Sequence, residues 1–323
     1  MEAFMQVIEG SALSKLVDYS FGDQRASWDS NLIGGFMKLA NATNAEFLAK
    51  AKEFEGHIMT LFIDNIRLYP RHVETTSEAD KQIVNTLMLT NNLLGLCSLL
   101  PNNGFIVFTG QEDTPIDDKI VLPFNVVKIY GVNALYNNER IIPFPIGLQR
   151  QIGVNDKRLE LMSKRLDLIE TSNEYGVRNP PTKLLYINCG IERNPERLPL
   201  SKFEGLNWVT TRFDKDSKFY PYERYNDFLS ELRDHKFVAC PKGHGYDTHR
   251  IWETLYMRRV PVMLKHPYFE RLLDGFPVLW VDKWEDITEQ SLTINDYLYE
   301  QAENLDINKL DLKMLYKTLT NSI

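Results

Sequence analysis

The apolar positions of the first half of the chain fall into short runs separated by amphipathic stretches. Runs rich in β-branched and aromatic residues at 58–62, 104–109, 126–130 and 140–145 predict four strands. Between the first two, residues 77–100 have the apolar spacing of a helix. The last run ends in prolines, which cannot extend a sheet ladder. Strands that alternate with helical stretches predict a parallel sheet.

The second half repeats this alternation after a break. Helices are predicted over 222–234 and from Asp247, and strands at 183–189, 207–211, 236–240, 260–264 and 277–281. Before them, residues 155–182 become charged and end in RNPPT, whose paired prolines disfavour both helix and central strand. We therefore expect an α/β protein with Rossmann-like domains at 1–170 and 171–293 and a helical segment at 294–323.

The length, charge and cysteine content of the chain limit the classes of protein to which it can belong. The 323 residues suit two α/β domains of about 150 residues each. The net charge of -7 is spread along the chain without a basic stripe, so we expect no nucleic-acid partner. Cys97, Cys189 and Cys240 lie far apart in or beside apolar runs, which predicts buried thiols rather than disulfides or zinc ligands. With no basic leader and no membrane-length apolar run, the sequence predicts a cytoplasmic chain without a membrane span.

Residues 236–264, KFVACPKGHGYDTHRIWETLYMRRVPVML, are the most informative stretch. They read as a strand, a glycine-bearing loop, a helix and a second strand, and in open α/β sheets ligands bind at the carboxyl ends of strands. Gly243 and Gly245 would let the backbone approach a bulky anion, towards which the first N–H groups of the next helix point. Lys242 and Arg250 add positive charge, so the stretch predicts a diphosphate site.

The helix that follows this loop has a polar and an apolar side. Arg250 and Glu253 share one face, beside His249, and Ile251 and Leu255 form the buried side. One interpretation is an exposed salt bridge. The other is that Arg250 binds phosphate and Glu253 accepts hydrogen bonds from ribose hydroxyls, which the preceding glycine loop favours.

Three further side chains of the helix have competing interpretations. Asp247 is placed to cap the helix, with or without a role in binding. Trp252 and Tyr256 lie four residues apart, and we expect them to pack in the core rather than to stack on a base.

The stretch also resembles the C-terminal signature of exostosin-like glycosyltransferases, in which a Cys-Pro-basic-Gly loop leads into Asp-x-x-Arg-x-Trp-Glu. The residues at those positions are Cys240, Pro241, Lys242, Gly243, Asp247, Arg250, Trp252 and Glu253. Residues 186–197 and 278–288 resemble segments that accompany the signature in soluble microbial and viral members. The resemblance covers nearly the whole second domain and does not extend before Pro180.

The resemblance implies a GT-B fold, in which two Rossmann-like domains face each other across a cleft. It further implies an inverting transfer of a hexose, or a pentose such as xylose, from a nucleoside diphosphate sugar to a glycan hydroxyl. The donor, with UDP as the expected nucleotide, would bind the second domain and the acceptor the first. No metal or other cofactor is expected, because side chains and helix N-termini neutralise the departing diphosphate.

The candidate site residues follow from these placements. Asn188 and Arg193 come after the strand at 183–189, and His244 lies between two glycines from which it could donate to a phosphate or the sugar. The full predicted donor site is Asn188, Arg193, Lys242, Gly243, His244, Gly245, Tyr246, Asp247, Thr248, Arg250 and Glu253.

An inverting transfer also needs a general base for the acceptor hydroxyl. Asp23 follows Gly22 in a turn-prone stretch, as expected after a first strand, and Asp113 follows Glu112 after the strand at 104–109. Either carboxylate could instead serve only its own turn, and His244 is the third candidate.

Two alternatives to a transferase remain. A nucleotide-sugar epimerase or hydrolase would turn over the donor without an acceptor. A catalytically silent protein that binds glycan or nucleotide would keep the loop and the helix but lack a functioning base.

Overall fold

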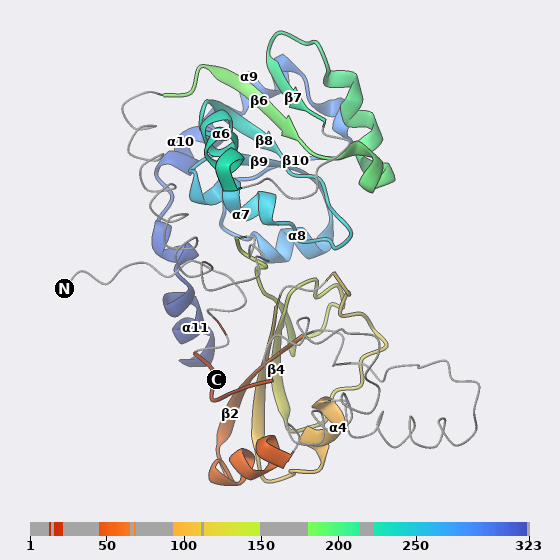
Figure 1. The fold of residues 1–323 in the computed structure, drawn as a ribbon, viewed down its shortest axis with the longest axis vertical. Helices are drawn as coiled ribbons and strands as arrows, with labels where there is room; N and C mark the ends of the chain where they lie inside the picture. The colour runs from red at the N-terminus through yellow and green to blue at the C-terminus, as the bar shows by residue number, and fades with distance from the viewer. Residues whose placement is uncertain are drawn as a thin grey trace, which may run out of the picture. The chain divides into compact units, whose positions relative to one another are not determined.

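The computed structural model describes residues 13, 16–21, 45–64, 68, 93–110, 113–148, 180–213 and 222–321. The chain divides into two compact units (Figure 1). The amino-terminal unit comprises Glu9–Pro145 and Leu315–Ile323, and the carboxyl-terminal unit comprises Met1–Ile8 and Ile146–Met314. Each unit is built on its own five-stranded parallel sheet, which confirms the predicted α/β class. The domain boundary predicted near residue 170 lies outside the described residues.

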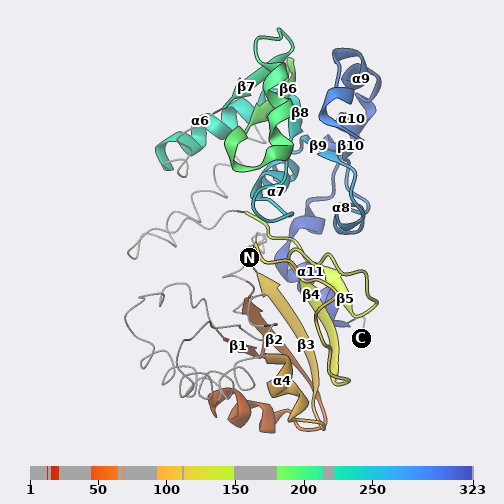
Figure 2. The same ribbon diagram turned by 90° about the vertical axis from the view of Figure 1, so that its right-hand side faces the viewer.

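The sheet of the amino-terminal unit follows the order of the sequence. Its strands are β1 (Tyr19–Ser20), β2 (Ile58–Asp64), β3 (Gly104–Gly110), β4 (Val126–Gly131) and β5 (Ile141–Pro143). They pair in parallel in the order β1-β2-β3-β4-β5, side by side in Figure 2. The four strands predicted in this half are therefore confirmed, with β5 shorter than expected because it ends at Pro143 and Pro145 follows two residues later.

The described helices of this unit cover both faces of its sheet. Near the end of the chain, the Tyr316 hydroxyl of α11 (Leu312–Asn321) lies 3.0 Å from the Thr60 hydroxyl, and the Tyr316 ring packs at 5.3 Å from Phe108. On the opposite face, Phe47, in helical residues 45–53, packs on Phe105. The helix predicted at 77–100 is described only as α4 (Leu93–Ser98).

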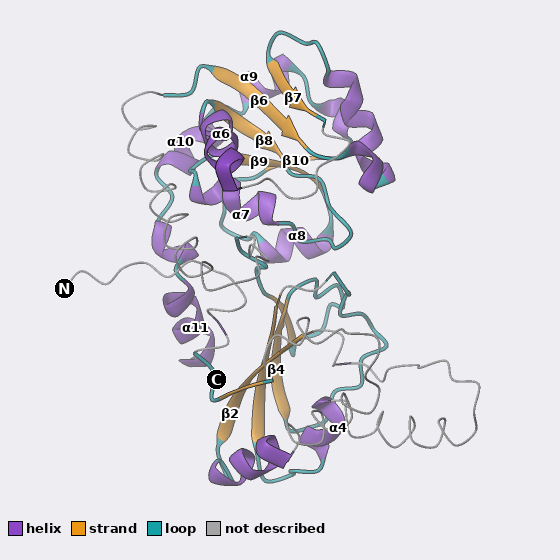
Figure 3. Cartoon of the chain, viewed as in Figure 1, coloured by secondary structure: helices purple, strands orange, loops and turns teal. Residues whose placement is uncertain are grey.

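The carboxyl-terminal unit has five parallel strands and most of the described helices (Figure 3). The strands are β6 (Lys183–Asn188), β7 (Val209–Arg212), β8 (His235–Ala239), β9 (Val260–Leu264) and β10 (Leu279–Val281). The α-helices are α6 (Tyr222–Arg233), α7 (His249–Tyr256), α8 (Pro267–Leu272), α9 (Glu289–Ile294) and α10 (Tyr297–Glu303). The 3-10 helices are η3 (Ile191–Arg193), η4 (Pro195–Phe203), η5 (Trp284–Asp286) and η6 (Ile307–Leu310).

The strand order of this unit reverses once. It runs β10-β9-β8-β6-β7, so the first strand of the unit, β6, lies between β7 and β8. At such a reversal the connections leaving β6 and β8 depart in opposite directions, and doubly wound proteins bind their ligands there, at the carboxyl ends of the strands. The loops that begin at Cys189 and Cys240 therefore form the expected binding edge.

The core of this unit lies on both faces of the sheet. Leu185 and Phe237 point to the face covered by α9 and α10, whereas Tyr186 packs on Phe228 of α6, and Figure 2 shows these helices on opposite sides of the strands. Trp252 and Tyr256 are fully buried, which confirms that they pack in the core.

The three cysteines are free thiols, as predicted. Cys97 and Cys240 are buried and Cys189 is half-buried. Burial raises the pKa of the Cys240 thiol to about 12, so this side chain is inert at neutral pH. None of the helices in the described part of the chain combines the length and the apolar character needed to cross a membrane.

Candidate anion-binding site

The loop that follows β8, residues 240–248, carries most of the predicted donor site. It starts as an extension of the sheet, because the Cys240 amide donates to the Val262 carbonyl at 3.0 Å. It then closes a tight turn, in which the Gly243 amide donates to the Gly245 carbonyl at 3.1 Å. Neither glycine has a positive φ, so any requirement for them would come from their small size rather than from a left-handed backbone.

Two polar side chains from the connection after β6 hold this loop. Arg197, on η4, donates from Nε to the Lys242 carbonyl at 2.8 Å and from Nη1 to the Gly190 carbonyl at 3.1 Å. Asn194, which caps η4, donates from Nδ2 to the Gly243 carbonyl at 2.8 Å. Neither residue is among those predicted from the sequence. The Asn-Pro dipeptide at 194–195, typical of a helix start, was the available signal, but it does not reveal the contact with a distant loop.

Lys242 lies at the rim of the site. Its Nζ is 2.6 Å from the Glu196 carboxylate, which is 45% exposed, and 4.9 Å from the centre of the Tyr246 ring. The Tyr246 ring in turn lies 4.9 Å from that of His266, whose pKa is lowered by burial and by Lys242. A phosphate group that bound Lys242 would therefore replace a solvent-exposed carboxylate, which is a weak competitor.

Arg250 and Glu253 form a buried pair on α7. Arg250 Nε lies 3.3 Å from Glu253 Oε2, and the two side chains are only 17% and 6% exposed. The Arg250 guanidinium also stacks at 4.2 Å over the ring of Phe228. The two residues share a face as predicted, with Ile251 and Leu255 buried on the other side. The interpretation as an exposed salt bridge is wrong, because both side chains are largely buried and Phe228 of α6 covers the guanidinium.

Asp247 does not cap α7. The N-cap residue is Thr248, which makes no side-chain cap bond, and the buried Asp247 carboxylate instead accepts from the Ile146 amide at 2.7 Å and from Trp252 Nε1 at 2.8 Å. The predicted cap is therefore wrong by one residue. Burial raises the pKa of Asp247 to about 7. His249 makes a parallel contact, with its Nδ1 at 2.7 Å from the Gly147 carbonyl, so both side chains secure residues 146–147.

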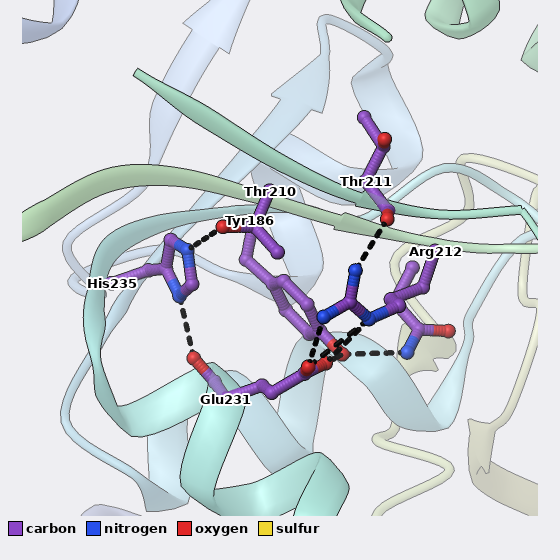
Figure 4. A network of polar contacts seen from close by, with 7 residues as sticks. Tyr186, Thr210, Thr211, Arg212, Glu231 and His235 are labelled. Atoms are coloured by element: carbon purple, nitrogen blue, oxygen red, sulfur yellow. Dashed lines mark hydrogen bonds and ion pairs between the residues drawn. The ribbon is translucent and has the colours of Figure 1, made fainter. Parts of the chain in front are cut away.

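Asn188 belongs to a polar network on the α6 face of the sheet. Its Nδ2 donates to the Tyr186 hydroxyl at 2.6 Å, and that hydroxyl donates to Glu231 at 2.8 Å. Arg212 pairs with the same carboxylate, as Figure 4 shows. The network fixes Asn188 at the carboxyl end of β6, beside the loop that starts at Cys189.

The remaining candidates differ in how far the structure describes them. His244 is exposed in the loop after β8, and Arg193 is exposed at the end of η3. Asp113 is exposed after β3, in the amino-terminal unit. Asp23 and Glu112 lie outside the described residues. Within the described ranges, no group of three His, Cys, Asp or Glu side chains is arranged to hold a metal ion.

The charges at this edge of the sheet are mostly positive. Burial lowers the pKa of the Arg197 guanidinium, and the nearby charges of Arg193 and Arg250 lower it further. Thr248 Oγ1 is buried, with no hydrogen-bond partner among the described residues. Several cations and a buried hydroxyl at the reversal of strand order suit an anionic ligand with several acceptor oxygens.

Comparison with known proteins does not assign the chain to a family. No protein-family model matches the sequence, and no curated protein matches it.

Proposed function

We propose that this chain is an inverting glycosyltransferase of the GT-B fold. It transfers a hexose, or a pentose such as xylose, from a nucleoside diphosphate sugar to a hydroxyl of a glycan acceptor. The observation that carries the proposal is the group of cations at the reversal of strand order between β6 and β8, around a loop and helix that resemble the exostosin-like signature. UDP is the nucleotide that the resemblance favours.

In this mechanism the donor's diphosphate is bound by the loop after β8 and by α7. Arg250 and Lys242 supply positive charge that strengthens its hold on the diphosphate as the bond to the sugar breaks. The acceptor oxygen attacks the anomeric carbon from the side opposite the diphosphate, so the configuration inverts. The base, which we place at Asp23, Asp113 or His244, takes the proton of that hydroxyl.

The Arg250–Glu253 pair has a defined part in this mechanism. Glu253 holds the guanidinium by its Nε edge, and the ring of Phe228 supports its plane. An arginine oriented in advance loses less freedom on binding phosphate than a mobile one. Glu253 would accept ribose hydroxyls only if the donor exposes its carboxylate, which is buried here.

The proposal is tested with a panel of nucleoside diphosphates and their sugars. A ligand at a hundred times its Kd raises the free energy of unfolding by about 2.7 kcal/mol, which a thermal shift assay detects. We expect one nucleotide to stabilise the protein, and its sugar derivative to be consumed only when a glycan acceptor is added. Consumption without acceptor would indicate an epimerase or hydrolase, and stabilisation without any consumption would indicate a silent binding protein.

A further inference from the structure

Three consecutive carbonyls of the loop after β8 face the connection after β6. The carbonyls of Lys242 and Gly243 accept from Arg197 and Asn194 at 2.8 Å each, and Arg197 Nη2 lies 3.5 Å from the Pro241 carbonyl. Side chains of a single neighbouring segment thus fix the orientation of three successive peptide groups. We call Asn194 and Arg197 the carbonyl clamp.

The clamp determines where the amides of the loop point. In a trans peptide group the C=O and the N–H point in opposite directions, and no cis peptide bond occurs in the described chain. The amides of residues 242–244 therefore point away from the clamp. The Gly243 amide is used in the turn to Gly245, whereas those of Lys242 and His244 have no acceptor among the described residues. Two amides that leave the same side of one short loop can bind the oxygens of one anion.

The clamp also brings a buried charge. Arg197 is 9% exposed, and its hydrogen-bond partners within the described chain are backbone carbonyls rather than a carboxylate. A buried cation without an anionic partner is unfavourable, and the neighbouring Arg193 and Arg250 add to the positive potential. An anion with more than one charge, bound at the loop amides, would relieve this imbalance.

We propose that Asn194 and Arg197 are positioning residues for the diphosphate. They hold the Pro241, Lys242 and Gly243 carbonyls on one side so that the Lys242 and His244 amides bind phosphate oxygens on the other. The inference rests on the proposed function for the identity of the ligand, a nucleoside diphosphate. The anion site itself is testable without a sugar or a nucleotide.

The test uses inorganic pyrophosphate as the probe and two substitutions that separate position from charge. Asn194→Ser keeps a hydroxyl that caps the Glu196 amide but removes the donor to the Gly243 carbonyl, with no change in charge. Arg197→Lys keeps the positive charge but loses the fork that spans several carbonyls. Lys202→Ala is the control, because Lys202 lies on the same 3-10 helix in an exposed pair with Glu285.

Calorimetric titration should show that each clamp variant binds pyrophosphate about tenfold more weakly or worse, as expected for a lost hydrogen bond to a charged group. The control should equal the wild type. In amide NMR spectra of the wild type, pyrophosphate should shift the Lys242 and His244 signals, and these shifts should shrink in Asn194→Ser. A variant with merely damaged folding would lose thermal stability and show dispersed changes across the spectrum.

Equal affinity in wild type and both clamp variants would overturn the inference, as would a wild type that binds no pyrophosphate. The proposed function fails separately. If pyrophosphate binding depended on the clamp but no nucleotide sugar were consumed, the role of the clamp would stand and the proposed transferase activity would be wrong. If the clamp variants consumed the donor with the rate and affinity of the wild type, the transferase would stand and the role of the clamp would be wrong.

Discussion

At the scale of single residues, Arg250 is the side chain whose role in donor binding is most directly testable. Alanine in its place would remove the cation beside the buried Glu253 carboxylate, which destabilises the fold and confuses the result. Lysine keeps the charge beside Glu253 and loses the planar, multiply donating group.

We predict that Arg250→Lys weakens binding of the donor nucleotide by about 1.5 to 3 kcal/mol, the range for hydrogen bonds to charged groups, with little change in thermal stability. Calorimetric titration with UDP measures this. Lys283→Ala, which removes an exposed pair with Asp286, is the matched control and should bind as the wild type does. Unchanged affinity in Arg250→Lys would mean that the Arg250–Glu253 pair only stabilises the fold.

The general base is the second prediction at this scale. Asn in place of Asp keeps the shape of the side chain and removes its basicity. The variant in which the general base is replaced should therefore have a kcat at least about a hundredfold lower, with an unchanged donor Kd. Steady-state kinetics of Asp23→Asn and Asp113→Asn decide between the two carboxylates. Asp118→Asn, at another exposed carboxylate of the same stretch as Asp113, is the control. Near-normal turnover in both variants would exclude them and leave His244.

At the scale of elements, the sequence predicted most of the strands of both sheets. Those at 104–109, 126–130, 183–189 and 260–264 agree with the structure within about one residue, because each is a compact run of β-branched and aromatic residues between turn signals. The 3-10 helix Pro195–Phe203 was not predicted, since a proline within it and weak amphipathicity hide it.

The carbonyl clamp could not be predicted from local patterns either. Arg197 and Lys242 are 45 positions apart, and their contact depends on β6 and β8 being neighbours. Neither the spacing of hydrophobic residues nor the resemblance to a motif reveals that β6 and β8 are neighbours. By contrast, Trp252 and Tyr256 were correctly assigned to the core because their side of α7 carries its apolar residues.

The start of β8 supports a prediction of pH dependence. His235 is fully buried, with its Nδ1 at the Glu231 carbonyl and its Nε2 at 2.7 Å from the Thr210 hydroxyl (Figure 4). Burial lowers its pKa from 6.5 to about 4, and Lys183 adds to the effect. The folded protein therefore keeps His235 neutral at pH values where the unfolded chain protonates it. The stabilisation is complete above about pH 6.5 and is lost as the pH falls through 4.

We predict that the difference in free energy of unfolding between wild type and His235→Gln shrinks as the pH falls from about 6.5 to about 4, with a slope of at most about 1.4 kcal/mol per pH unit. Urea titrations of both proteins at several pH values measure this difference. The comparison uses the difference between the two proteins because the raised pKa of Asp247 makes both of them more stable as the pH falls through the same range. This contribution cancels in the difference. Parallel pH profiles for the two proteins would contradict the assignment.

At the scale of the whole molecule, the two parallel sheets differ in the order of their strands. The described strands of the amino-terminal sheet follow the sequence without a reversal, whereas the carboxyl-terminal sheet reverses once, where the cationic loops lie. This difference agrees with our proposal that the donor binds the carboxyl-terminal unit. The order of strands is a long-range property, and the sequence patterns alone gave only their parallel direction.

We predict that sugar transfer proceeds without a divalent metal, because Lys242, Arg250 and the loop amides supply the positive charge that the diphosphate needs. Transfer activity measured after extensive treatment with a chelator should equal that of the untreated protein. Loss of activity that magnesium or manganese restores would contradict this, and would point to a metal carried by the donor or held by acidic side chains.

The central claim is that the protein moves a sugar from a nucleoside diphosphate to a glycan with inversion. The most direct measurement is proton NMR of the reaction of purified protein with an α-linked UDP-sugar, with and without a glycan acceptor. We expect UDP to appear only when acceptor is present, in equal amount to a β-linked product. An α-linked product, UDP release that is independent of the acceptor, or no consumption of any nucleotide sugar would contradict it.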